Sequence, residues 1–135
     1  MRLLIDGNII LDVLQNRKPH VDDSAGVWKL CETEQAEGYV SALTFTNLVY
    51  IMRKELTPGK INEVLGSLGL IFRFADLTVS DMNRAAELEW EDYEDALQAV
   101  TARRLRADCI ITRNIKGFKQ SAVPALTPAE FISRL

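Results

Sequence analysis

Residues 91–114 read EDYEDALQAVTARRLRADCIITRN. Apolar and small side chains recur at helical spacing between residues 94 and 106, which predicts one long helix. The run DCIIT at 108–112 is short and apolar, as expected of a strand that is buried on both faces. A helix that leads directly into such a strand is typical of an α/β fold, in which helical crossovers join parallel strands.

The alternation of strands and helices extends over the whole chain. The other predicted strands are RLLI at 2–5, YVSAL at 39–43, IFRFADL at 71–77 and VPAL at 123–126. Further helices are predicted at 8–17, 20–36, 47–56, 59–70, 81–91 and 127–135. The plausible N-caps are Thr44 or Thr46, Ser80 and Thr127. These elements predict a three-layer α/β/α fold around a central parallel sheet of four to five strands.

Size and composition limit the class of protein. A chain of 135 residues, 47% hydrophobic, is expected to form a single domain over 1–135. A net charge of -3 disfavours a strongly cationic nucleic-acid binder but leaves local basic patches open. Cys31 and Cys109 lack C-x-x-C spacing and no secretory leader is seen, so a reducing cytoplasm is expected. No apolar run approaches the roughly 20 residues of a membrane helix.

Several predicted strands end in polar residues, at Asp6, at Ser41 and at residues 112–114. In open parallel sheets, ligands bind beyond the carboxyl ends of the strands, so we expect these ends to form one site. Asp92 and Asp95 stand three residues apart at a helix start and therefore share a face. Carboxylates that converge without histidine suit Mg2+ or Mn2+, which can activate water against a phosphodiester.

Each of these residues also has a purely structural explanation. Asp6 alone is most simply a helix cap, and Asp92 and Asp95 can equally cap the helix that they begin. Thr112 and Asn114 are ordinary turn residues when each is considered by itself. Their joint placement at the ends of neighbouring strands is what favours a functional site.

In combination, these motifs resemble the PIN domain family. The opening LLIDGNIILDVL at 3–14 resembles the family's DTN(V/I)L(L/I)D, and DYEDALQAVTARRLRADCIITRNIKGF with VPALTPAEF, within 92–131, resembles its C-terminal block. The resemblance implies a PIN-like fold and a metal-dependent ribonuclease of the small VapC-like toxin type. Such a toxin would cleave RNA with Mg2+ or Mn2+, bind a cognate antitoxin and in many cases form a homodimer.

The resemblance also implies roles for individual residues. Asp6, Asp95 and Asn114 would bind the metal, with Asn114 at the position of a later acid. Asn8 would orient the site and Thr112 would support it. The expected catalytic residues are therefore Asp6, Asp92, Asp95, Thr112 and Asn114, and the expected supporting residues are Asn8, Ser41 and Asn47.

The sequence departs from the family pattern at three positions. Asn47 stands where many members carry glutamate, Asn114 where a fourth acid is common, and Gly7 where threonine or aspartate is usual. An asparagine can coordinate a metal through its carbonyl oxygen but contributes no charge. We therefore expect one metal ion rather than two, and reduced activity.

Three functions remain open on the sequence alone. The first is the metal-dependent endoribonuclease, and the second is a catalytically weak or inactive relative that binds RNA or a protein. The third, a phosphoacceptor signalling domain, would need paired acids after the first strand and a lysine near the last, and the run VPAL at 123–126 has none. If the protein cleaves or binds RNA, Arg113 and Lys116 are expected to contact the phosphate backbone.

Overall fold

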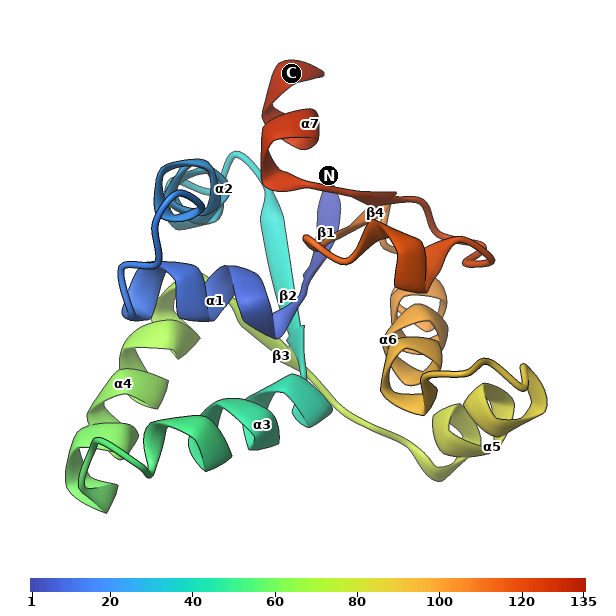
Figure 1. Ribbon diagram of the computed structural model, residues 1–135, viewed down its shortest axis with the longest axis horizontal. Coiled ribbons are helices and arrows are strands. Elements are labelled where there is room, and N and C mark those ends of the chain that lie inside the picture. Colours follow the sequence, from blue (N-terminus) through green and yellow to red (C-terminus); the bar gives the residue numbers. More distant parts are fainter.

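The computed structural model describes residues 1–135 and contains one all-parallel sheet of five strands, in the order β3-β2-β1-β4-β5 (Figure 1). The strands are β1 (Arg2–Ile5), β2 (Glu37–Ser41), β3 (Arg73–Ala75), β4 (Cys109–Ile111) and β5 (Ala125–Leu126). All five overlap predicted strands, although β3, β4 and β5 are shorter than predicted and β2 lies two residues earlier. The central parallel sheet inferred from the sequence is therefore confirmed.

Seven α-helices and one short 3-10 helix connect and follow the strands. They are α1 (Gly7–Leu14), α2 (Val21–Glu32), α3 (Ala42–Met52), α4 (Pro58–Ile71), α5 (Val79–Glu87), α6 (Tyr93–Arg104), η1 (Ile115–Phe118) and α7 (Pro128–Ser133). None of them combines the length and the apolar character that crossing a membrane requires.

The side chains of β1 alternate between two apolar layers, because successive residues of a strand point to opposite faces. Leu3 and Ile5 are fully buried in a core that includes residues of α1, α2, α3, α4 and α7. Leu4 packs on the other face, against Ala102 of α6 and Phe118 of η1. Figure 1 shows α1 to α4 on one side of the sheet and α6, with α5 packed against it, on the other. The three-layer α/β/α architecture is confirmed.

The helix starts after β2 and β3 differ from the sequence prediction. Ser41 ends β2 and caps α3, because its hydroxyl oxygen accepts the N–H of Thr44, so neither Thr44 nor Thr46 is the cap. Thr78, not Ser80, caps α5 in a reciprocal capping box with Asp81. In both cases, the strand stops earlier than its apolar pattern because a hydroxyl side chain takes over the first helical N–H groups.

Because all strands run in the same direction, the carboxyl ends of β1 and β4 lie side by side. From β1 the chain passes into α1 on one face, whereas from β4, its neighbour, it passes into η1, whose Phe118 packs with Leu4 on the other face. Connections that leave adjacent parallel strands for opposite faces leave a crevice at their carboxyl ends. The residues that follow β1 and β4 therefore meet there.

Two glycines provide a matched test of the packing. A Cβ at Gly38 of β2 would lie 2.7 Å from Sγ of Cys31 and 2.8 Å from the ring of Phe72, whereas a Cβ at Gly66 of α4 would meet nothing within 4 Å. We expect Gly38→Ala to destabilise the fold by about 1–3 kcal/mol through overpacking. Gly66→Ala, on an exposed helix, should stabilise it by about 0.5–1 kcal/mol. Urea denaturation measures both changes, and equal unfolding free energies for the two variants would contradict the packing of β2 against α2.

Candidate active site

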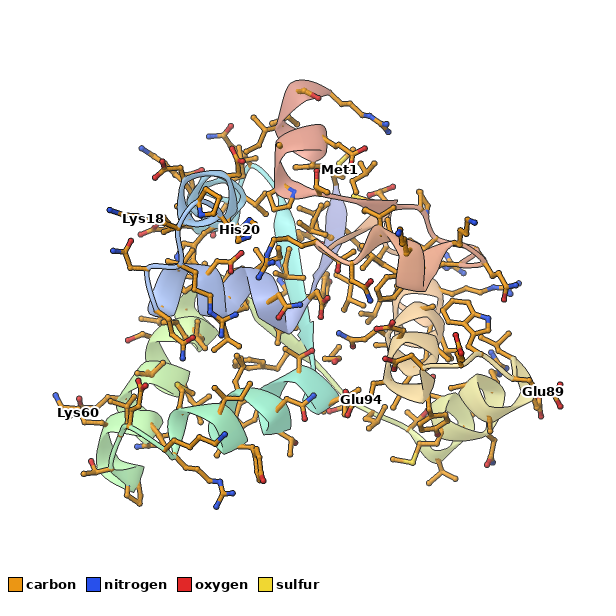
Figure 2. The ribbon with its side chains drawn as sticks, viewed as in Figure 1. Met1, Lys18, His20, Lys60, Glu89 and Glu94 are labelled. Atoms are coloured by element: carbon orange, nitrogen blue, oxygen red, sulfur yellow. The ribbon has the colours of Figure 1, made fainter.

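A polar cavity of about 280 Å3 opens at the carboxyl end of β1, between α1, α3 and α6. Its polar lining residues are Asp6, Asn8, Thr44, Asn47, Asp92, Glu94, Asp95, Gln98 and Asn114. Glu94, which lines the cavity, belongs to the first turn of α6, and Figure 2 shows it beside the start of α3. This residue marks the position of the cavity in the molecule. The structure thus brings six of the predicted site residues into one cavity.

Asp6 caps α1 and faces this cavity. Its Oδ1 accepts the N–H of Gly7 at 2.8 Å, and its Oδ2 accepts the hydroxyl of Thr112 at 2.7 Å. Burial raises the pKa of Asp6 above its usual value, although the hydrogen bonds from Thr112 and Gly7 and the charge of Arg113 oppose that rise. A carboxylate oxygen has two acceptor sites, so each oxygen of Asp6 keeps one for a further ligand. The capping role expected for Asp6 is confirmed, and it is compatible with a role in the cavity.

The two acids at the start of α6 have different surroundings. Asp92 is the N-cap, and its Oδ1 accepts the N–H of Asp95 at 3.1 Å. The Asp95 carboxylate caps nothing and instead accepts a hydrogen bond from the Asn114 side-chain amide at 3.1 Å. Burial, with repulsion from Asp92 and Asp6, raises the pKa of Asp95 to about 6. A side chain at Gly117 would collide with Asp95 and Asn114, so the glycine leaves room for this pair.

Thr112 and Ser41 support the cavity from behind without lining it. Thr112 is fully buried, donates its hydroxyl to Asp6 and accepts the N–H of Asn114 at 3.0 Å. Ser41 is also fully buried and donates to Oε1 of Gln98 at 2.6 Å. We did not identify Gln98 from the sequence. The available signal was a polar residue one turn after Asp95, on the same face of a helix.

The two predicted RNA-binding cations lie in different surroundings. Nε and Nη2 of Arg113 each donate to a carboxylate oxygen of Asp12 at 3.0 Å, and Asp12 is fully buried in α1. Asp12 also accepts the Ser24 hydroxyl at 2.9 Å. Arg113 is therefore part of an internal ion pair that joins the end of β4 to α1. Lys116 is exposed on η1, next to Gly117.

The donors in the cavity fit a hydrated divalent cation. No group of three or more carboxylate, histidine or cysteine side chains is placed to hold a metal by itself. Asp6 and Asp95 are two of the acids in the lining, and Asn8, Asn47 and Asn114 add neutral oxygens to it. Mg2+ usually takes one or two carboxylates and keeps several waters, so two acids and amides are a sufficient set. A cation there would also offset the repulsion that raises the pKa of Asp95.

Comparisons with known proteins agree with this fold. A family model described as PIN domain matches residues 2–116. A search of curated proteins found no match. The structure resembles a toxin–antitoxin complex from Klebsiella pneumoniae, with TM-score 0.72 and 22% identity over 93% of this chain and 97% of the other. It also resembles VapBC2 from Rickettsia felis bound to a promoter DNA fragment, with TM-score 0.72 and 19% identity over 94% and 98% of the two chains.

A third solved structure is more distant. VapC20 from Mycobacterium tuberculosis, described as a toxin that cleaves the sarcin–ricin loop, has TM-score 0.62 and 10% identity over 80% of this chain and 86% of the other. At these identities, the likeness of all three structures concerns the fold.

The raised pKa of Asp95 makes the stability of the metal-free protein depend on pH. The folded pKa of about 6 exceeds the ordinary aspartate value of 3.8, so the folded state binds the proton more tightly than the unfolded state. Protonation of Asp95 therefore stabilises the folded state. This stabilisation is fully present below the unfolded pKa and is lost as the pH rises through about 6. Asp95→Asn should therefore be more stable than wild type near neutral pH and should depend less on pH.

Thermal unfolding in the presence of a chelator, between about pH 4 and pH 7, measures this difference. Asp23→Asn, at an exposed acid on α2, is the control and should keep the wild-type pH dependence. Parallel curves for wild type and Asp95→Asn would mean that the Asp95 carboxylate is not held in a repulsive, partly buried environment.

Proposed function

The chain belongs to the PIN domain family, and from this membership and its acidic cavity we propose that it is a divalent-metal-dependent endoribonuclease of the toxin–antitoxin type. The convergence of Asp6 and Asp95 on one cavity is the observation that carries the proposal. Similar folds in toxin–antitoxin complexes, and in a toxin described as cleaving the sarcin–ricin loop, support it. The family resemblance read from the sequence agrees with the family match.

In this proposal, Asp6 and Asp95 hold the metal ion. When bound, Mg2+ or Mn2+ supplies a water of lowered pKa and positive charge beside the scissile phosphate. The N–H of Gly7 and the hydroxyl of Thr112 orient Asp6, because they occupy one acceptor site on each of its oxygens. The amide of Asn114 orients Asp95 in the same way. The two acids are thus held in place before any ligand arrives.

The neutral residues limit the charge of the site. Asn47 and Asn114 line the cavity at positions where carboxylates would add negative charge. Because amides coordinate more weakly than carboxylates, the proposal includes one ion and modest activity. A non-catalytic protein that binds RNA or a protein partner is the second candidate. The hydrogen bond from Asn114 to Asp95 favours it, because that bond occupies a potential metal-binding oxygen.

The proposed substrate and partners follow from the same assignment. We propose that Lys116, exposed beside the Asp95–Asn114 pair, contacts the RNA backbone, whereas Arg113 acts through Asp12 on the position of α1. A cognate antitoxin, a homodimer and a cytoplasmic location are part of the proposal. The similar structures that were solved with antitoxins support the first of these.

Removal of either acid tests the catalytic proposal. Asp6→Asn and Asp95→Asn should each abolish Mn2+-dependent RNA cleavage and the associated inhibition of growth, because each removes a charged donor from the cavity. Asp23→Asn is the charge-matched control on α2 and should cleave like wild type. Cleavage of a labelled RNA, with circular dichroism to verify folding, provides the measurement.

The outcomes distinguish the two candidates. Normal cleavage by both site variants would refute the assignment of Asp6 and Asp95. A wild-type protein that binds RNA but cleaves none with Mn2+ would favour the non-catalytic binding protein.

Lys116→Ala tests whether Lys116 contacts the RNA backbone. A phosphate contact releases counterions, so its loss should weaken binding and reduce the slope of log K against log salt by about 1. Lys60→Ala is the control, because Lys60 is equally exposed but lies at the far end of the molecule on α4 (Figure 2). Filter binding to the inactive Asp95→Asn background at several salt concentrations gives both slopes. An unchanged slope for Lys116→Ala would remove this lysine from the RNA path.

A further inference from the structure

We propose that Gln98 is a positioning residue of the acidic cavity, which sets the placement of Asp95 on α6 relative to Asp6 at the end of β1. This inference rests on the proposed function, since it gives Gln98 a purpose in that site. It begins with a buried amide on α6 that joins three separate parts of the fold.

The hydrogen bonds of Gln98 are all to distant residues. Its Oε1 accepts the hydroxyl of Ser41, the last residue of β2, at 2.6 Å. Its Nε2 donates to Oγ1 of Thr44, in the first turn of α3, at 2.9 Å. The Ser41 hydroxyl oxygen in turn accepts the backbone N–H of Thr44 at 3.1 Å, which closes a ring of three residues. All three side chains are buried, with exposures of 5% or less. The ring therefore clamps α6 to the junction of β2 and α3.

The position of Gln98 on α6 connects this clamp with the site. Asp95 lies three residues earlier and thus on the same face of the helix. Any rotation or shift of α6 that breaks the contacts of Gln98 also moves Asp95 relative to Asp6. The contacts span 54 and 57 residues of sequence, so they fix tertiary placement rather than local helix geometry.

The chemistry of the amide also suits the neighbouring acid. One N–H of Nε2 is used by Thr44, and the second remains available to Asp6, which lines the same cavity. The side-chain amide of Gln98 lowers the pKa of Asp6, against the larger effect of burial. A carboxylate at this position would add negative charge beside Asp6 and Asp95, and an apolar side chain would leave two buried hydroxyls without their partner.

Thr101 is a buried polar residue of the same helix that has a purely structural role. It is equally buried, at 1% exposure, but its hydroxyl donates at 2.8 Å to the carbonyl of Leu97 within α6. It does not line the cavity. Thr101→Val is therefore a matched control that removes one buried hydrogen bond and leaves the placement of α6 unchanged.

The test compares Gln98→Met with Thr101→Val in two measurements. Calorimetric titration with MnCl2 should show an affinity at least about tenfold weaker for Gln98→Met, and within about twofold of wild type for Thr101→Val, even where both variants lower the melting temperature. Crystal structures without metal should show an altered separation of the Asp6 and Asp95 carboxylates only in Gln98→Met. Wild-type affinity or unaltered carboxylates in Gln98→Met would overturn the positioning role.

A second variant covers the case in which Gln98→Met does not fold. Thr44→Val preserves the shape of the side chain and removes the acceptor for Nε2 of Gln98, so it should weaken Mn2+ binding in the same direction. Wild-type affinity and carboxylate placement in Thr44→Val would then overturn the inference. If the wild-type protein itself binds no Mn2+, the metal proposal fails, and the metal-free crystal structures alone decide whether Gln98 sets the separation of the two acids.

Discussion

The convergence of two partly buried carboxylates, Asp6 and Asp95, is the constraint around which the site is built. Like charges that lose water repel one another, and the pKa of about 6 at Asp95 expresses that cost. The fold offsets it with donors from several elements. Gly7 and Thr112 donate to Asp6, and Asn114 donates to Asp95. The result is an acidic cavity in which both of these carboxylates accept hydrogen bonds from the protein.

The same repulsion bears on the neutral residues of the cavity. Asn47 and Asn114 line the cavity where further acids would increase the repulsion. Asn114 does more than reduce the charge, because its amide donates directly to Asp95. In the proposed site, amides at these two positions would bind a metal less strongly than carboxylates but cause less repulsion in the metal-free cavity. This trade is a physical reason to expect a single ion and modest activity in the proposed nuclease.

The buried carboxylate of Asp12 is neutralised in a different way, by an arginine of the protein itself. It receives two hydrogen bonds from Arg113 and one from Ser24, so its charge is fully paired inside the protein. Breaking such a pair leaves an uncompensated buried charge, which is strongly destabilising. The ion pair therefore fastens the end of β4 to α1, close to Asp6, and the positive charge of Arg113 favours ionised Asp6. Arg113, which was expected from its sequence position to contact RNA, thus also helps to support the site through Asp12.

The sequence by itself determined the elements, the parallel sheet and the convergence of polar strand ends, because these depend on hydrophobic periodicity and on the geometry of parallel strands. Asp6 and Asn114 could be placed together on that basis, whereas the choice of Asp95 as a partner of Asp6 came from the resemblance to the PIN domain family. Tertiary structure alone decided that Asp92, and not Asp95, caps α6, and that Arg113 pairs with Asp12. It also revealed Gln98. The partners of Arg113 and Gln98 lie 101 and up to 57 residues away, and such hydrogen bonds depend on the packing of helices against the sheet, which no local pattern of residues specifies.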